Sequence, residues 1–204
     1  MDPVKYLKEQ DGLLNNLIDY VVDSGHVTMI GRGESDYESL VRSIVGQQVS
    51  TASARATFGR LLAAAGDSGI TPKSVASMTF EELRSTGLSG SKTSYIQGLG
   101  QAVLNREIDL SSLYSKSDEE VVAELQHLRG VGRWTAEMFL IFQMESEDIF
   151  PLSDGGIRSA TTKLYSLPKD TTNATLLEIA EKWRPYRSLA TRFLWGGLNA
   201  GYFA

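Results

Sequence analysis

The sequence predicts an all-α protein, and three observations point to this class. Apolar residues recur every three to four positions along almost the whole chain, which is the spacing of an amphipathic helix. Helix start signals recur between these stripes. Strand-like alternation is confined to residues 26–30, and the chain has no internal repeat, low-complexity tract or long Gly/Ser linker. We therefore expect about ten short helices.

The first helices are indicated by apolar stripes, and the later ones by their start and stop signals. The stripes consist of Leu13, Leu14, Leu17, Ile18, Val21 and Val22, and of Leu40, Val41, Ile44 and Val45. The signals are Ser50 before a helix over 51–62, Pro72 after Thr71, capping boxes at Thr79–Glu82 and Ser117–Glu120, and C-terminal caps at Gly87 and Gly130.

The composition fits a globular protein. With 204 residues, 42% of them hydrophobic, the chain can bury a core as one domain or two small ones. It contains no cysteine, which excludes disulfides, cysteine-ligated zinc, iron–sulfur clusters and a cysteine nucleophile. Neither His26 nor His127 has metal-ligand partners at a useful spacing.

The net charge of −5 argues at first against a nucleic-acid partner, because a surface that binds phosphate is usually basic. The charge is unevenly distributed, since residues 1–125 carry −6 and residues 126–204 carry +1. The acidic N-terminus lacks a secretory signal, and no window approaches about 18 uninterrupted apolar residues. We expect an intracellular protein without membrane contact.

The most informative segment is a helical hairpin within residues 121–144. A helix with its apolar face at Val121, Val122, Leu125 and Leu128 is predicted to stop at Gly130, and a second helix to start near Gly132. In so short a turn, Gly130 and Gly132 supply positive φ or a close backbone approach, and Val131 can pack inward.

The start of the second helix is a candidate anion site. The N–H groups of its first turn have no partner within the helix and lie at the positive end of the helix dipole, where Arg129 and Arg133 would add charge. An ordinary helical hairpin in a core remains an alternative from the turn alone.

Four ordered segments extend this interpretation. They are VRSIVGQQVSTASA from Val41, GVGRWTAEMF from Gly130, DIFPLSDGGIRSA from Asp148 and AEKWRPYRSLATRFLW from Ala180. Together they resemble the helix-hairpin-helix (HhH-GPD) DNA glycosylases, specifically the alkylpurine (3-methyladenine) branch. The resemblance covers residues 38–200.

The resemblance implies two helical subdomains with an active-site cleft between them. The first is a central bundle over 31–145 that ends in the helix-hairpin-helix, and the second combines 1–30 with 146–204 and carries the catalytic carboxylate. Trp134 and Asp154 would face each other across the cleft.

Asp154 is the catalytic carboxylate that the resemblance implies. Breaking an N-glycosidic bond builds positive charge on the deoxyribose, which a fixed carboxylate stabilises while it orients or deprotonates water. From the residues alone, Asp154 caps the helix that starts at Gly155, and the two roles are compatible.

The base pocket would contain Trp134, Met138 and Trp195. Related bifunctional glycosylases have Lys at position 134, whereas an indole cannot form a Schiff base, so we expect a monofunctional hydrolase without lyase activity. Flat aromatic faces stack on a flipped base and attract the cationic alkylated purine. As an alternative, both tryptophans are core residues.

Two positions depart from the pattern of some relatives. These relatives have Tyr where Met138 stands and a carboxylate where Ser153 stands, which bears on the range of substrates.

DNA contacts are implied for two further groups. Gln47 and Gln48 would fill the gap left by the flipped base and probe the opposite strand, with Gln48 preferred as the wedge; a solvated helix end is the alternative. The phosphate-binding group is Arg129, Gly130, Gly132, Arg133 and Thr135. Arg129 replaces the Pro that is common in this hairpin. Arg187 is expected to bridge helices or hold the Asp154 region, and Pro185 to lie in the first turn of the last helix.

No cofactor is expected to be required. By resemblance, a structural Na⁺ or K⁺ would bind the backbone carbonyls of Gln126, Leu128 and Val131, with no side-chain metal site and no iron–sulfur cluster.

The predicted activity is the hydrolytic removal of alkylated purines, such as 3-methyladenine and 7-methylguanine, from duplex DNA by a monomer, leaving an abasic site. Two alternatives stay open, namely a non-catalytic helix-hairpin-helix DNA-binding protein and a sister glycosylase for deaminated or oxidised bases.

Overall fold

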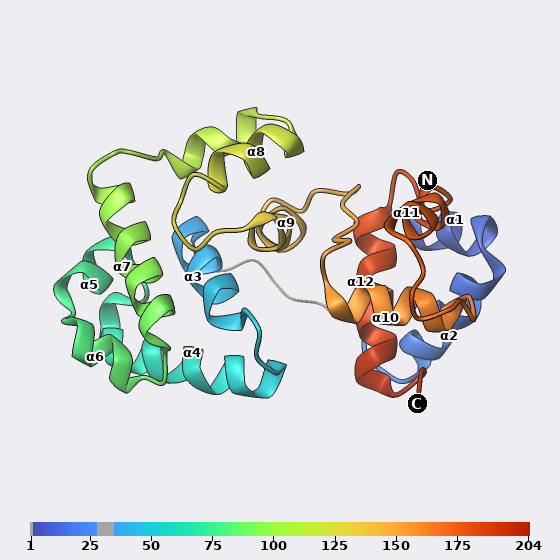
Figure 1. Ribbon diagram of the computed structural model, residues 1–204, viewed down its shortest axis with the longest axis horizontal. Helices are drawn as coiled ribbons and strands as arrows, with labels where there is room; N and C mark the ends of the chain where they lie inside the picture. The colour runs from blue at the N-terminus through green and yellow to red at the C-terminus, as the bar shows by residue number, and fades with distance from the viewer. Residues whose placement is uncertain (1, 28–34) are drawn as a thin grey trace. The chain divides into compact units, whose positions relative to one another are not determined.

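A computed structural model describes residues 2–27 and 35–204, and within these ranges the regular elements are all helices (Figure 1). The α-helices are α1 (Pro3–Gln10), α2 (Gly12–Asp23), α3 (Asp36–Gly46), α4 (Thr51–Ala65), α5 (Pro72–Ser77), α6 (Phe80–Ser85), α7 (Gly90–Leu104), α8 (Asp118–Leu125), α9 (Arg133–Phe142), α10 (Gly155–Leu164), α11 (Asn173–Glu181) and α12 (Arg187–Ala200). Two 3₁₀ helices are η1 (Gly66–Ser68) and η2 (Leu110–Ser115). The predicted all-α class is confirmed. Residues 28–30 of the strand-like stretch lie outside the described residues.

The chain divides into two compact units. One combines residues 1–30 with 145–204 and is called the terminal unit here, and the other, the central unit, spans residues 31–144. The terminal unit contains α1, α2 and α10–α12, and the central unit contains α3–α9. Across residues 2–27 and 35–204, no helix is long and apolar enough to span a bilayer.

Helix α12 packs against α2 and α10 in the terminal unit. Gly196 permits the close approach to α2, because a Cβ there would lie 2.6 Å from Val21 Cγ1 and 2.8 Å from the His26 carbonyl oxygen. The buried face of α2 is narrower than the predicted stripe, since Leu13 is 44% and Val22 52% exposed. Leu13 and Val22 lie at the two edges of the apolar face of α2. Because the helix has about 3.6 residues per turn, these two side chains point away from the core.

Asp11 is a buried polar centre of the terminal unit. Its Oδ1 accepts the N–H groups of Leu13 at 3.0 Å and Leu14 at 3.1 Å, which caps α2. Its Oδ2 accepts the Tyr165 hydroxyl and the Trp183 indole N–H, the latter at 3.2 Å. Burial raises the pKa of Tyr165, and the Asp11 carboxylate adds to that shift. One carboxylate therefore satisfies the polar atoms that the aromatic core would otherwise leave without partners.

Helix α3 packs against α4, α7 and α9 in the central unit. The predicted stripe of α3 is confirmed, because Leu40, Val41, Ile44 and Val45 are all buried. The two capping boxes, the Ser50 cap and the Pro72 start are confirmed as well. Helix α4 runs three residues beyond the predicted 51–62.

Two predicted helix boundaries are wrong. Helix α8 ends at Leu125, five residues before Gly130, because the backbone hydrogen bonds then switch to the three-residue spacing of Leu128 N–H to the Leu125 carbonyl. Pro185 lies outside α12, whose first residue is Arg187, since Tyr186 takes the N-cap position.

We expect Asp11→Ala to lower the free energy of unfolding by about 2–4 kcal/mol, because it removes a helix cap and leaves the buried Trp183 donor and the partly buried Tyr165 donor unpaired. Asp2→Ala is the matched control, since Asp2 caps α1 at an exposed position and should cost about 1 kcal/mol or less. Urea denaturation of the three proteins measures the difference. Equal losses for the two variants would contradict the role of the buried network.

Candidate functional site

Asp154 holds the start of α10. It is the N-cap residue, and its Oδ1 accepts the Ile157 backbone N–H at 2.8 Å. The same oxygen accepts the indole N–H of Trp195 at 3.4 Å, so that α12 contributes to the position of the carboxylate. Asp154 and Trp195 are both partly buried. The predicted helix cap is confirmed, and the structure places Asp154 and Trp195 together.

Gly156 leaves the space that this carboxylate occupies. A Cβ at position 156 would lie 3.1 Å from Asp154 Oδ1 and 3.2 Å from Leu198 Cδ1. Both distances are tighter than ordinary van der Waals contact, so a larger residue would force the Asp154 carboxylate or the Leu198 side chain to shift. Sequence reasoning assigned no role to Gly156, although the Gly-Gly pair after Asp154 was the available signal.

The segment that leads to Asp154 is tied to the start of α12. Arg187 Nε donates to Asp148 Oδ1 at 2.6 Å, and its Nη2 donates to the Asp148 carbonyl at 2.9 Å. Ser188 Oγ accepts the Ile149 N–H at 2.9 Å. Arg187 also reaches Glu181 of α11 at 3.5 Å. It is thus a bridge within the terminal unit, as the sequence predicted.

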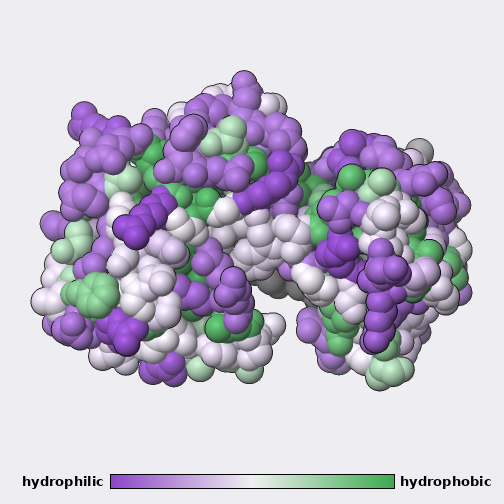
Figure 2. Space-filling model, in the orientation of Figure 1, coloured by the Kyte–Doolittle hydropathy of each residue, from purple (hydrophilic) through white to green (hydrophobic). Residues whose placement is uncertain are grey.

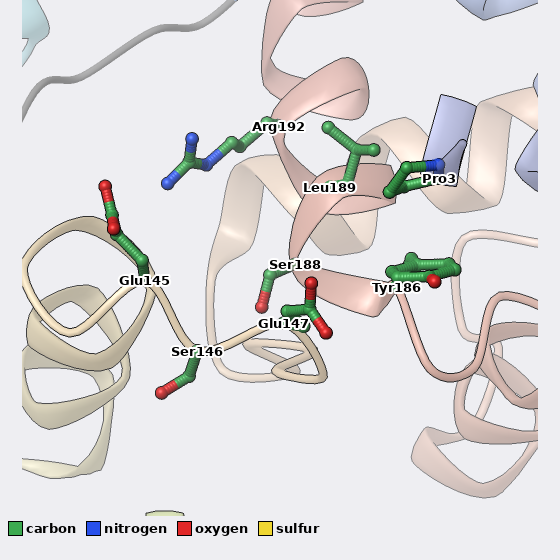
Figure 3. A pocket seen from close by; sticks show the side chains of 8 residues that line it. All are labelled: Pro3, Glu145, Ser146, Glu147, Tyr186, Ser188, Leu189 and Arg192. Carbon is green, nitrogen blue, oxygen red and sulfur yellow. The ribbon is translucent and has the colours of Figure 1, made fainter. Parts of the chain in front are cut away.

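A pocket in the same unit lies beside the N-terminal half of α12 (Figure 3). Its lining residues are Pro3, Glu145, Ser146, Glu147, Tyr186, Ser188, Leu189 and Arg192. Burial lowers the pKa of the Arg192 guanidinium, and the Glu145 carboxylate opposes that shift. Asp154 is not among the lining residues, so the pocket and the carboxylate are separate features.

The hairpin turn of the central unit uses its two glycines differently. Gly130 has φ +88°, and a Cβ there would lie 2.7 Å from Tyr95 Cβ and closer still to the Tyr95 ring. Gly132, the N-cap of α9, has φ −90°, and apart from its own chain neighbours no protein atom lies within 4 Å of a built Cβ. The prediction is confirmed for Gly130 and wrong for Gly132, because the chain already leaves the left-handed region at Val131. Val131 packs inward and is 5% exposed, as predicted.

The two hairpin arginines differ in their partners. Arg129 is exposed, with its guanidinium carbon 6.0 Å from the centre of the Tyr95 ring. Arg133 pairs with Glu119 at 2.7 Å and with the buried Glu137 at 2.9 Å. The Glu119 hydrogen bond raises the pKa of Arg133, and the same contact lowers the pKa of Glu119. The charge of Arg133 is therefore compensated within the protein.

The first turn of α8 places negative charge on the surface next to Arg133. Asp118, Glu119 and Glu120 form the first turn of α8. Figure 2 shows a largely hydrophilic surface over this helix. The positive charge predicted at the turn is therefore smaller than the count of arginines suggests.

Gln47 and Gln48 have different environments. The Gln47 side chain donates from Nε2 to the Gly130 carbonyl and to Thr135 Oγ1, both at 2.9 Å. Thr135 is 2% exposed, so its hydroxyl faces the protein interior. Gln48 is exposed and has φ +54°, which is rare for a residue with a side chain. Of the two glutamines, Gln48 is the one whose side chain is presented to solvent.

The remaining predicted residues lie in the central unit. Trp134 and Met138 are on α9, the first partly buried and the second 5% exposed. Gln126, Leu128 and Val131 lie in or beside the hairpin turn, where the Val131 N–H donates to the Leu128 carbonyl at 3.0 Å. Within the described residues, no group of three or more His, Cys, Asp or Glu side chains is placed to hold a metal ion.

Comparisons with known proteins match this arrangement. A family model described as "HhH-GPD superfamily base excision DNA repair protein" matches residues 41–185. "DNA-3-methyladenine glycosylase 1" of Schizosaccharomyces pombe is 32% identical over 161 residues, which are 78% of this chain and 71% of the relative. "Alkylbase DNA glycosidase-like protein mag2" of the same organism is 28% identical over 195 residues, with coverage of 94% and 90%. A solved structure of the S. pombe 3-methyladenine DNA glycosylase in complex with abasic DNA has a TM-score of 0.86 at 29% identity and covers 96% of this chain and 95% of that one.

The two glycines of the turn provide a matched pair of variants. We expect Gly130→Ala to lower the free energy of unfolding by about 2–4 kcal/mol, because it adds a clash with Tyr95 to an unfavourable φ. Gly132→Ala should cost no more than about 1 kcal/mol, since alanine is only a poorer N-cap residue. Urea denaturation measures both, and a Gly132→Ala loss as large as that of Gly130→Ala would contradict the assignment.

Proposed function

Since the chain belongs to the HhH-GPD superfamily of base excision DNA repair proteins, we propose that it is a DNA glycosylase for alkylated bases. It flips an alkylated purine out of duplex DNA and hydrolyses the N-glycosidic bond, leaving an abasic site. The observation that carries the proposal is the helix-capping carboxylate of Asp154, held by an indole N–H. Relatives named for 3-methyladenine support the alkylated substrate.

Asp154 supplies the charge that bond cleavage requires. As the base leaves, positive charge develops on the deoxyribose, and a carboxylate already in place stabilises it without reorganisation. The Ile157 and Trp195 N–H groups keep Oδ1 in position. The same carboxylate can orient and deprotonate the attacking water.

The substrate base carries its own activation. Alkylation at purine N3 or N7 makes the base a cation, which leaves without protonation by a general acid. We propose that Trp134, Met138 and Trp195 contact the flipped base. The electron-rich tryptophan faces attract the cation more than a neutral purine, by about 0.5–2 kcal/mol per contact.

The hairpin is the proposed phosphate-binding element. Gly132 is the N-cap of α9, and the open space beside it lets an outside group approach the backbone there. The N–H groups at the start of α9 and the exposed Arg129 favour a DNA phosphate at this position. Arg133 can contact the same phosphate only if it gives up its exposed partner Glu119. Breaking this surface ion pair costs about 1 kcal/mol or less.

Three further features are proposed from the family. By family resemblance, a Na⁺ or K⁺ ion would bind the backbone carbonyls of Gln126, Leu128 and Val131, of which the Leu128 carbonyl also accepts the Val131 N–H. The ion would hold the turn rigid beside the phosphate. We also propose that the protein acts as a monomer and works where genomic DNA is.

The central test is base release by the wild type, Asp154→Asn and the control Asp170→Asn. Asp170 is exposed. The proteins are incubated with methylated duplex DNA and the released bases are identified. We expect release of 3-methyladenine and 7-methylguanine by the wild type and the control. Asp154→Asn should release them at least about 100-fold more slowly because the charge is lost, while binding the same DNA.

Other outcomes would replace the proposal. Turnover retained in Asp154→Asn would contradict the mechanism. Wild-type binding without release would indicate a non-catalytic DNA-binding protein. Release of uracil, hypoxanthine or 8-oxoguanine alone would move the substrate to deaminated or oxidised bases.

A second prediction concerns the absence of lyase activity. Trp134 stands on the first turn of α9, and an indole cannot form the Schiff base that precedes strand cleavage. Borohydride treatment during turnover should therefore trap no covalent protein–DNA complex, and the abasic product should keep an intact strand. Trapping by the wild type would show that another amine attacks the sugar.

A further inference from the structure

The loop between α3 and α4 is held by a lysine from a third helix. Lys92 of α7 donates from Nζ to the Val45 carbonyl at 2.8 Å and to the Gln47 carbonyl at 2.7 Å. Carbonyls at the C-terminal end of a helix have no partners within it, and an ammonium group satisfies two of them here. Burial lowers the pKa of Lys92, so the protein accepts a desolvation cost to keep this charge in place.

The same loop is tied to the hairpin by Gln47. Its Nε2 reaches the Gly130 carbonyl and the Thr135 hydroxyl, both at 2.9 Å. The two donors of the amide are thus used inside the protein, one on the hairpin turn and one on α9. The family resemblance instead implies that Gln47, like Gln48, contacts the opposite DNA strand.

Gln48 lies between two parts of the chain that hydrogen bonds hold in place. It is exposed and has φ +54°, a conformation that persists in a residue with a side chain only where the surroundings enforce it. On its N-terminal side, the Gln47 carbonyl is held by Lys92. On its C-terminal side, Ser50 begins α4 by accepting the Ser53 N–H at 3.3 Å.

We propose that Lys92 and Gln47 are positioning residues that hold Gln48 in its left-handed conformation and couple it to the hairpin. The inference rests on the proposed function, in which Gln48 enters the gap left by the flipped base while the hairpin binds the backbone. Displacement of a positioning group by about 1 Å can cost about 100-fold in rate, so such a wedge has to be rigid. In this proposal, Lys92 acts by holding the Val45 and Gln47 carbonyls and makes no contact with a DNA phosphate.

The test compares duplex and single-stranded substrates. Single-stranded DNA has no gap to fill, so a wedge defect should spare it. One oligonucleotide carrying 7-methylguanine is used in both forms with the wild type, Lys92→Met, Gln47→Met and Gln48→Ala. Lys73→Met is the matched control, since Lys73 is an exposed lysine of the same unit.

We expect Lys92→Met to slow release from the duplex by about tenfold, the loss for removing hydrogen bonds to a charged group. Gln47→Met should act in the same direction, and single-stranded release should change by less than about twofold. In the double variant, Lys92→Met should add little to Gln48→Ala, because the lysine acts through that residue. Equal losses on both substrates, or additive losses in the double variant, would overturn the proposal.

A second readout separates this inference from the proposed function. The fluorescence of 2-aminopurine beside the methylated base rises when the stack opens, whether or not the base is released. Lys92→Met and Gln48→Ala should both reduce this rise, and Lys73→Met should not. An unchanged rise in Lys92→Met would overturn the positioning role, whereas a wild type that opens the stack without releasing the base would contradict only the glycosylase proposal.

Discussion

The hydrogen bond from the Ile157 backbone N–H to the Asp154 carboxylate is the constraint on which the proposed chemistry depends. The first N–H groups of a helix need a hydrogen-bond acceptor, and a catalytic carboxylate has to be held in a fixed position. The Asp154 side chain meets both requirements. The surrounding features follow from it. Gly156 leaves room for the oxygen, and Trp195 of α12 donates to it. The ion pairs of Arg187 fix the segment that precedes it.

Several basic side chains of the described residues have partners within the protein. Arg133 and Arg187 each pair with two carboxylates, and Lys92 caps backbone carbonyls. The net charge of −5 is therefore a poor guide to DNA binding. In the proposed mode, DNA affinity comes from the backbone N–H groups of α9 and from Arg129, which need no excess of basic residues.

The hairpin shows where sequence reasoning succeeds and where it stops. Gly130 could be predicted, because a turn this short needs a residue with positive φ. Gly132 looked equivalent in sequence, yet its φ is ordinary and the space around it is open. The end of α8 was also misplaced, since the chain continues in three-residue turns that keep the apolar spacing of the helix.

The sequence by itself determined the all-α class, the capping boxes, the Asp154 cap and the family motifs. The first three depend on residues within about four positions of one another, whose hydrogen bonds and apolar spacing are local. Only the tertiary structure decided that Gln47 serves the hairpin while Gln48 is exposed, and that Lys92 holds their loop. Gln47 reaches residues 83 and 88 positions away, and Lys92 contacts carbonyls 45 and 47 positions before it. No local pattern predicts such contacts, because they arise only when α3, α7 and the hairpin pack together.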